Sequence, residues 1–197
     1  AGMDGEGYGA AAAFGASLNI KTDQVVKTGY AESDNAYGSF NTLRTSVKAG
    51  TGLINNKFTV DTRLSRITSD GYIDRANSNL KSFYLSGAWI GKKSLLRLNV
   101  FSGKQTSYQA WNGSPESRIK NDVAGMNAYA DRNGLSQEDR ENLLNSDRRY
   151  NSFTYENQTD NYQQDHYQLH FTHRFTNKLN VNISGHYTKA RGYDQEC

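Results

Sequence analysis

Apolar and polar residues alternate along most of the chain. In the stretch that begins at residue 57, Phe58, Val60 and Leu64 share one parity, and Lys57 and Arg63 share the other. The same alternation recurs in the stretches 43–49, 82–89, 96–100, 167–175 and 179–187. A period of two is typical of β-strands with one apolar face, so it predicts six strands of about 9–13 residues, with a weaker one near 28–33. Ordinary strands have about 5–6 residues, whereas tilted membrane-spanning strands need about 9–11.

The connections between these strands alternate in length. Those at 50–56, 91–92 and 176–178 are short, and those at 34–36, 68–78 and 105–165 lie between them, two of the three being long. Short turns at one end and long loops at the other are typical of outer-membrane barrels. A two-residue turn at 91–92 would pair Leu85 with Leu98, and a three-residue turn at 176–178 would pair Phe171 with Ile183.

The connection 105–165 is too long to lack secondary structure in a compact protein. Its first part shows helical spacing, at Ile119, Val123, Met126 and Ala130, and Asn133-Gly134 is a helix stop. Ser136 begins a second helix in the manner of a capping box. We therefore expect a helical hairpin on the rim of the barrel.

Composition and charge exclude several classes of protein. The chain has 197 residues, of which 36% are hydrophobic and 12% aromatic, with a mean hydropathy of −0.82. Its only cysteine is Cys197, so no internal disulfide is possible, and a net charge of +3 does not indicate nucleic-acid binding. The sequence contains no nucleophile elbow, phosphate-binding loop or metalloprotease helix. We therefore expect neither an enzyme nor a cofactor.

Three segments, in this order, resemble the TonB-dependent outer-membrane receptors. They are the Gly/Ala-rich stretch 7–22, which contains Gly15-Ala16-Ser17-Leu18-Asn19-Ile20, the segment 37–44 (YGSFNTLR), and the segment 66–74 (RITSDGYID). The resemblance implies an all-β fold: an antiparallel transmembrane β-barrel segment of about seven long strands, preceded by the end of a plug domain. Residues 1–24 would be the end of the plug, with Phe14 and Leu18 inside the barrel. Residues 25–197 would be the N-terminal part of the barrel, with the partly helical extracellular loop 105–165.

The resemblance also implies a function. The chain would belong to a longer receptor, in the outer membrane of a Gram-negative bacterium, that imports a scarce solute such as a ferric siderophore or a similar iron chelate. Its partners would be outer-membrane lipid, the remainder of the receptor chain, and a surface lipoprotein. The inner-membrane TonB complex would act through a segment outside this chain, and no nucleic acid is expected.

The long loop holds the candidate ligand-binding residues. It carries ten acidic and six basic residues, a net charge of −4, and several aromatic side chains that can stack on sugars or aromatic chelators. The candidates are Tyr108, Trp111, Tyr150, Tyr155, Tyr162, Asp165 and His166. The polar strand face carries the residues expected to contact the plug, namely Arg44, Arg63, Arg97 and Arg174. No metal site is assigned, because His170 and His173 fall on opposite strand faces.

Two other functions fit the same pattern. A passive porin-like barrel would lack a plug, and a soluble secreted carbohydrate-binding module would bury its apolar strand faces. The exposure of four apolar residues separates the barrel from the soluble module. In a barrel, Phe58, Leu64, Leu98 and Phe171 face lipid and are exposed in the protein alone.

Overall fold

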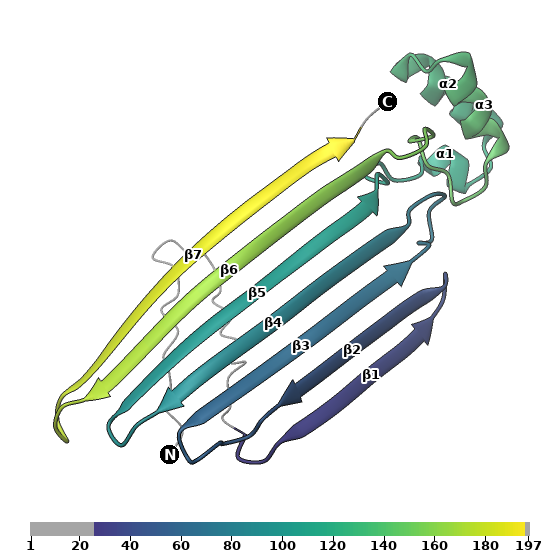
Figure 1. Ribbon diagram of the computed structural model, residues 1–197. Coiled ribbons are helices and arrows are strands. Elements are labelled where there is room, and N and C mark those ends of the chain that lie inside the picture. The colour runs from purple at the N-terminus through teal and green to yellow at the C-terminus, as the bar shows by residue number, and fades with distance from the viewer. Residues whose placement is uncertain (1–25, 196–197) are drawn as a thin grey trace.

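The computed structural model describes residues 26–195 and shows one antiparallel sheet of seven strands in sequential order (Figure 1). The prediction of an all-β antiparallel fold is therefore confirmed. The strands are β1 (Tyr30–Gly38), β2 (Thr42–Gly50), β3 (Phe58–Ser69), β4 (Ser78–Ile90), β5 (Ser94–Tyr108), β6 (Thr159–Arg174) and β7 (Asn180–Gln195). The sequence motif 7–22, with Phe14 and Leu18, lies outside the described residues.

The strands are longer than the alternation predicted, and this moves two connections. The segment 34–36 is not a connection but part of β1, and the chain turns at 39–41, where Phe40 and Asn41 have positive φ. The long connection is 109–158 rather than 105–165, because β5 extends to Tyr108 and β6 begins at Thr159. Polar residues at these strand ends concealed the continuation.

One of the two predicted registers is confirmed and the other is wrong. Phe171 pairs with Ile183 across β6 and β7, as expected. Across β4 and β5, however, Leu85 pairs with Val100 rather than Leu98. The turn takes in Lys93 as well, and the Gly91 N–H donates to the Ser94 carbonyl at 2.8 Å. Because the shift is two residues, every side chain keeps its predicted face.

Three helices occupy the long connection: α1 (Glu116–Ile119), α2 (Val123–Asn133) and α3 (Gln137–Asn145). The helix stop is confirmed by Gly134, which caps α2 at φ 62°, and the start of α3 by Ser136, whose hydroxyl accepts from the Asp139 N–H. The spacing from residue 119 to 130 does not form one helix, because Asn121 has positive φ and Asp122 caps a new helix start. We call residues 109–158 the helical insertion.

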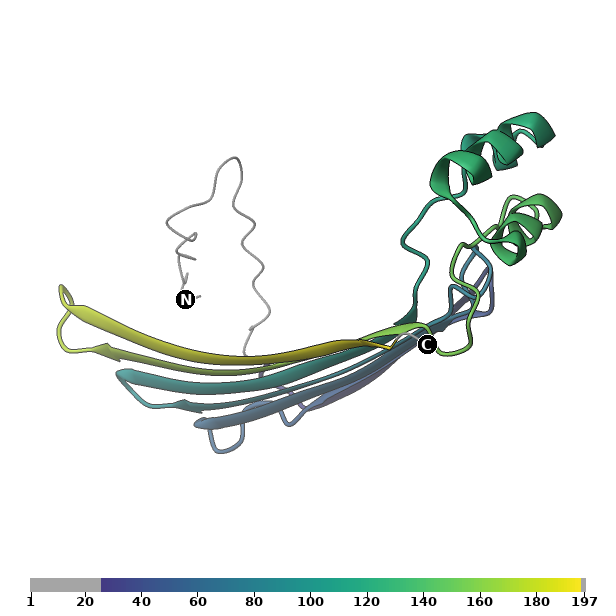
Figure 2. The ribbon, with the colours of Figure 1, turned by 90° about the horizontal axis from the view of Figure 1, so that it is seen from above.

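The sheet is curved, and the helical insertion rises from the concave side at one end (Figure 2). The connections 51–57, 91–93 and 175–179 lie together at the opposite end, whereas the short turn 39–41 lies at the same end as the insertion (Figure 1). In the described part of the chain, the hydrophobic core cluster lies inside the helical insertion and consists of Met126, Ala130, Leu143 and Tyr150. No helix among residues 26–195 is long and apolar enough to cross a membrane.

Candidate functional site

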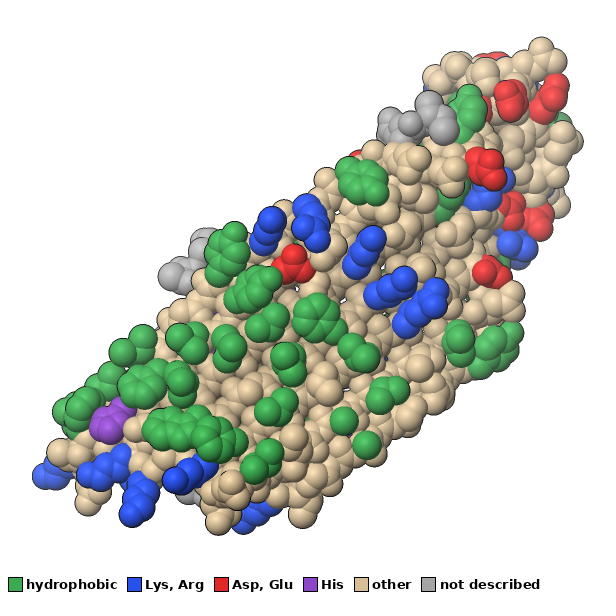
Figure 3. All heavy atoms as spheres, in the orientation of Figure 1, with side chains coloured by type: hydrophobic (Ala, Val, Ile, Leu, Met, Phe, Trp, Pro, Cys, Tyr) green, Lys and Arg blue, Asp and Glu red, His purple; other side chains and the backbone are tan. Residues whose placement is uncertain are grey.

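The convex face of the sheet carries the apolar side chains. Every strand ladder is continuous, so the alternation between faces runs without interruption from β1 to β7. The apolar side chains form a band across the middle of this face, with Lys and Arg on either side of it (Figure 3). Large side chains in this band are exposed, and Leu98, for example, is 50% exposed. We call these apolar side chains of the convex face the apolar band, whose exposed large members on β2 to β7 are Leu43, Val47, Phe58, Val60, Leu64, Phe83, Leu85, Trp89, Leu96, Leu98, Tyr167, Leu169, Ile183 and Tyr187.

Three of the four apolar residues that a barrel is expected to expose are exposed in the structure. Phe58, Leu64 and Leu98 are exposed, whereas Phe171 is half-buried against its neighbours. Trp89 lies near the turn end of the apolar band, and Tyr167 and Tyr187 pair across β6 and β7 with ring centroids 6.2 Å apart. Their positions at the edges of the band fit those of interfacial aromatic residues.

The concave face is polar and its centre is buried. Ser86 donates to the Asn99 amide oxygen at 2.8 Å, and the Asn99 amide nitrogen donates to Gln168 at 3.2 Å, so one polar row crosses three strands. Asn99 is only 4% exposed. A sheet whose polar face is more buried than its apolar face is the inverse of a soluble sheet, in which the apolar face is covered.

The arginines expected to contact a plug lie on this concave face. Arg44, Arg63 and Arg97 border one open depression together with Lys48 and Asp61. The Arg63 Nε donates to the Ser46 hydroxyl at 3.1 Å, and Arg97 is buried. Arg174 has the same facing but lies at the turn end of β6, away from the other three. The structure therefore groups three of the four predicted residues.

The two neighbouring candidates Asp165 and His166 point to opposite faces of β6. His166 borders the concave depression, where its ring stacks on Phe101 with centroids 4.5 Å apart and its Nδ1 pairs with the Thr188 hydroxyl at 2.9 Å. Tyr162 borders the same depression. Asp165 lies on the convex face, where it accepts from the Ser102 hydroxyl. Asp165 and His166 therefore do not form a common site.

Two candidate tyrosines hold the helical insertion together. Tyr150 is 3% exposed and packs in the core of the insertion. Burial raises the pKa of its phenol above the ordinary value, and the neighbouring Tyr129 and Asp139 add to the shift. Tyr108 is buried where β5 meets the insertion, and its hydroxyl donates to the Tyr155 carbonyl. Both side chains have little surface left for a ligand.

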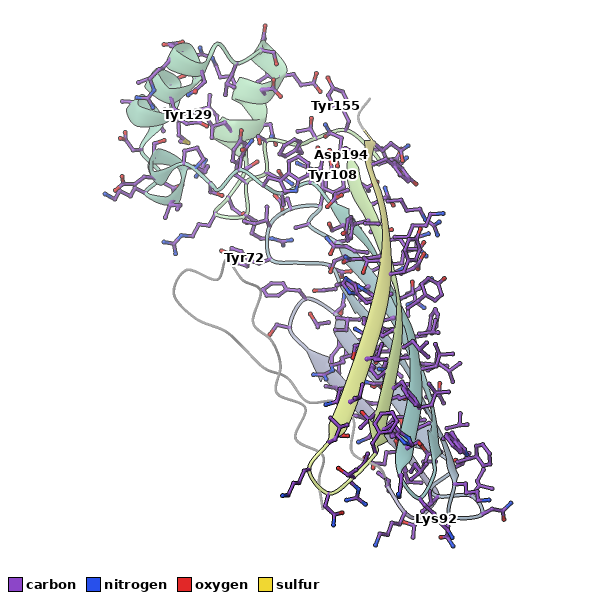
Figure 4. All side chains as sticks on the ribbon, turned by 90° about the vertical axis from the view of Figure 1, so that its left-hand side faces the viewer. Tyr72, Lys92, Tyr108, Tyr129, Tyr155 and Asp194 are labelled. Carbon is purple, nitrogen blue, oxygen red and sulfur yellow. The ribbon has the colours of Figure 1, made fainter. Side chains whose placement is uncertain are left out.

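Two other candidate aromatics are free to meet a ligand. Trp111 is 58% exposed and contacts Phe153 edge to face, with centroids 5.9 Å apart, and the Tyr155 side chain is also exposed. Figure 4 shows Tyr155 and Tyr108 near one another where the sheet meets the helices, while Lys92 lies at the far end of the sheet. The insertion thus presents flat aromatic surface at the end of the sheet where the long connections gather.

Sequence reasoning missed the residues that fix the insertion to the loop between β3 and β4. The fully buried Asn151 donates to the carbonyls of Asp74 and Gln109 at 2.9 and 3.0 Å. Arg75 donates from Nε to the Phe153 carbonyl at 2.9 Å, and Arg149 pairs with Asp74 at 3.2 Å. The contacts with Asp74 and Arg75 join residues more than 70 positions apart, so no local pattern could reveal them.

Comparisons with family models and with curated proteins identify no relative. No protein-family model matches the sequence, and no curated protein matches it. Within residues 26–195, no three His, Cys, Asp or Glu side chains gather as a metal site would require. The function is therefore argued from the geometry of the two faces and of the insertion.

Proposed function

We propose that this chain is part of the wall of a TonB-dependent outer-membrane receptor. The observation that carries this proposal is the inverted polarity of the sheet, with an exposed apolar band on the convex face and a polar concave face that is buried at its centre. In a barrel, the convex face contacts lipid and the concave face lines the lumen. The inversion alone fits a porin-like barrel equally well. The resemblance of segments 7–22, 37–44 and 66–74 favours a receptor.

The shape of the apolar band gives independent support. Leu43 on β2 pairs with Thr68, and the same row continues through Asn79 and Thr106 to Asn161 on β6. On β6, however, the band begins only at Tyr167, six residues closer to the turn end. Its upper edge therefore descends about 20 Å along the strand over four strand spacings of about 4.8 Å each. An edge that lies in the membrane plane then requires strands tilted by about 45°, as in transmembrane barrels.

The imported solute, in this proposal, meets the helical insertion first. Trp111 and Tyr155 offer exposed rings at the end with the long connections, which is the extracellular end of an outer-membrane barrel. Aromatic rings stack on planar chelating groups and on sugars alike. A ferric siderophore or a similar iron chelate is the solute class we propose, with a glycan as the competing outcome of the test.

Solute uptake by the native bacterium tests this proposal. We expect deletion of the gene to reduce uptake of labelled iron chelates under iron limitation, and the double variant Trp111→Ala/Tyr155→Ala to reduce it at least fivefold. Tyr193→Ala is the matched control, because Tyr193 is an exposed aromatic residue on β7 outside the insertion. If chelate uptake were unchanged and growth on a glycan were reduced, the imported solute would be a glycan rather than an iron chelate. Recovery of the protein in the soluble fraction would overturn the receptor itself.

A further inference from the structure

Five basic side chains lie on the convex face beyond the apolar band, towards the end of the sheet with the long connections. In the register, Arg66 on β3 pairs with Lys81 on β4, and Lys81 pairs with Lys104 on β5. The same row reaches Gln163 on β6 and Arg191 on β7. Lys189 lies on the same face of β7, two residues closer to the apolar band than Arg191. We call Arg66, Lys81, Lys104, Lys189 and Arg191 the basic row, which is visible as Lys and Arg side chains above the apolar band in Figure 3.

The basic row carries little compensating negative charge. Like charges directly opposite one another across strands destabilise a sheet, yet Arg66, Lys81 and Lys104 are consecutive partners. Among the described residues, the one ion pair of the row joins Arg191 to Asp165 at 4.0 Å. Arg66 donates instead to the neutral amide of Asn79 at 3.2 Å. Such an arrangement is stable when an anion from outside the sheet binds between the side chains.

The position of the basic row identifies the kind of anion. Arg66 lies two residues beyond Leu64, and Lys81 two residues beyond Phe83, so these two cations border the last large apolar side chains of β3 and β4. Lys104 lies four residues beyond Val100 on β5. In the described sheet, the convex positions between the row and the short turns carry no charged side chain except Asp165. A lipid matches both the apolar face and the cations at its border, because its acyl chains would contact the apolar band and its phosphate groups would contact the basic row.

We propose that Arg66, Lys81 and Lys104 form a binding site for the phosphate groups of lipid headgroups in the leaflet around the outer end of the barrel. This inference rests on the proposed membrane location. Neighbouring residues on one face of a sheet have Cβ atoms about 4.5–5.5 Å apart, so three cations reach one or two phosphates of a single headgroup. Thr45, the partner of Arg66 on β2, adds a hydroxyl at the end of the row.

A lipid titration of the protein purified from outer membranes tests the site. The probes are bisphosphorylated lipid A and the same lipid without phosphates, with the bound lipid counted by native mass spectrometry. We expect the wild type to bind the phosphorylated probe at least tenfold more tightly than the other. In Arg66→Gln/Lys81→Gln/Lys104→Gln this preference falls below threefold, and relief of the like-charge opposition keeps the sheet folded.

The matched control removes the same charge from the helical insertion. Lys120→Gln/Arg132→Gln/Arg148→Gln changes three exposed cations away from the apolar band and is expected to keep the wild-type preference. A basic-row variant that retains the preference, or a wild type without one, overturns the lipid site while leaving the barrel intact. Extraction of the wild-type protein from membranes by alkaline carbonate overturns both proposals.

Discussion

The Tyr150 phenol is held in the core of the helical insertion, beside Met126, Ala130 and Leu143. Removal from water disfavours its ionised form and raises its pKa above the ordinary value of about 10. In the unfolded insertion the phenol ionises near that ordinary value. The contribution of this group to stability is therefore complete below pH of about 10, and it is lost as the pH rises through the higher folded-state pKa.

We expect the variant Tyr150→Phe to lose this alkaline sensitivity. The difference between the tyrosinate absorbance titrations of wild type and variant isolates Tyr150, and its midpoint is expected above pH of about 10. Over the same pH range, proteolysis of the insertion by an alkaline protease increases more in the wild type. Tyr155→Phe is the control, because the Tyr155 side chain is exposed. A midpoint at or below the ordinary value would contradict the burial of Tyr150.

At the scale of the strand, each β-strand of a barrel presents one face to lipid and the other to the lumen. The free-energy cost of a charged side chain on the lipid face depends on its depth in the membrane. A cation on the lipid face of a barrel costs about 2–4 kcal/mol at the membrane midplane and about 0–1 kcal/mol near the interfaces. Leu98 lies within the apolar band on β5, and Thr106 lies on the same strand and face beyond Lys104. The two positions are eight residues apart, which separates a midplane site from an interfacial one.

We therefore expect Leu98→Arg to lower the free energy of unfolding in lipid by about 2–4 kcal/mol and Thr106→Arg by less than about 1 kcal/mol. Urea-induced unfolding in vesicles, followed by tryptophan fluorescence, measures both. Equal and small effects at the two positions would show that the convex face is solvated, as in the soluble module, because a cation on a solvated sheet face costs little.

The sequence predicts strands better than it predicts their ends and partners. A period of two identifies the two faces of β3 or β7 because every second side chain meets the same environment. It does not fix the β4–β5 register, since pairing Leu85 with Leu98 or with Val100 leaves the faces unchanged. The sequence also did not distinguish the exposed Trp111 from the buried Tyr150, since both are aromatic residues of the same insertion. Their burial depends on distant contacts such as those of Asn151.

The whole sheet has an apolar boundary that runs obliquely to the strand register. If the strands stood upright in a membrane, residues of one register row would share one depth, so Leu43 and Asn161 would be equally deep. If the strands tilt by about 45°, Leu43 instead shares the depth of Tyr167, and Asn161 lies outside the hydrocarbon. Three cations of the basic row then lie at the boundary, because Arg66 and Lys81 border the band on β3 and β4 and Lys189 borders it on β7. Lys104 and Arg191 lie farther out, four residues beyond Val100 and Tyr187.

Spin labels on single cysteines at positions 43, 161 and 167 distinguish the two geometries in reconstituted vesicles. We expect the labels at 43 and 167 to be equally accessible to oxygen, which partitions into hydrocarbon, and the label at 161 to be accessible to a water-soluble nickel chelate. Cys197 is replaced by Ser in all three variants, so that each protein carries one label. Matching accessibility at 43 and 161 would refute the tilt, and high nickel accessibility at all three positions would place the convex face in water. The first result would leave a membrane sheet of different geometry, whereas the second would remove both the lipid-facing band and the headgroup site at its border.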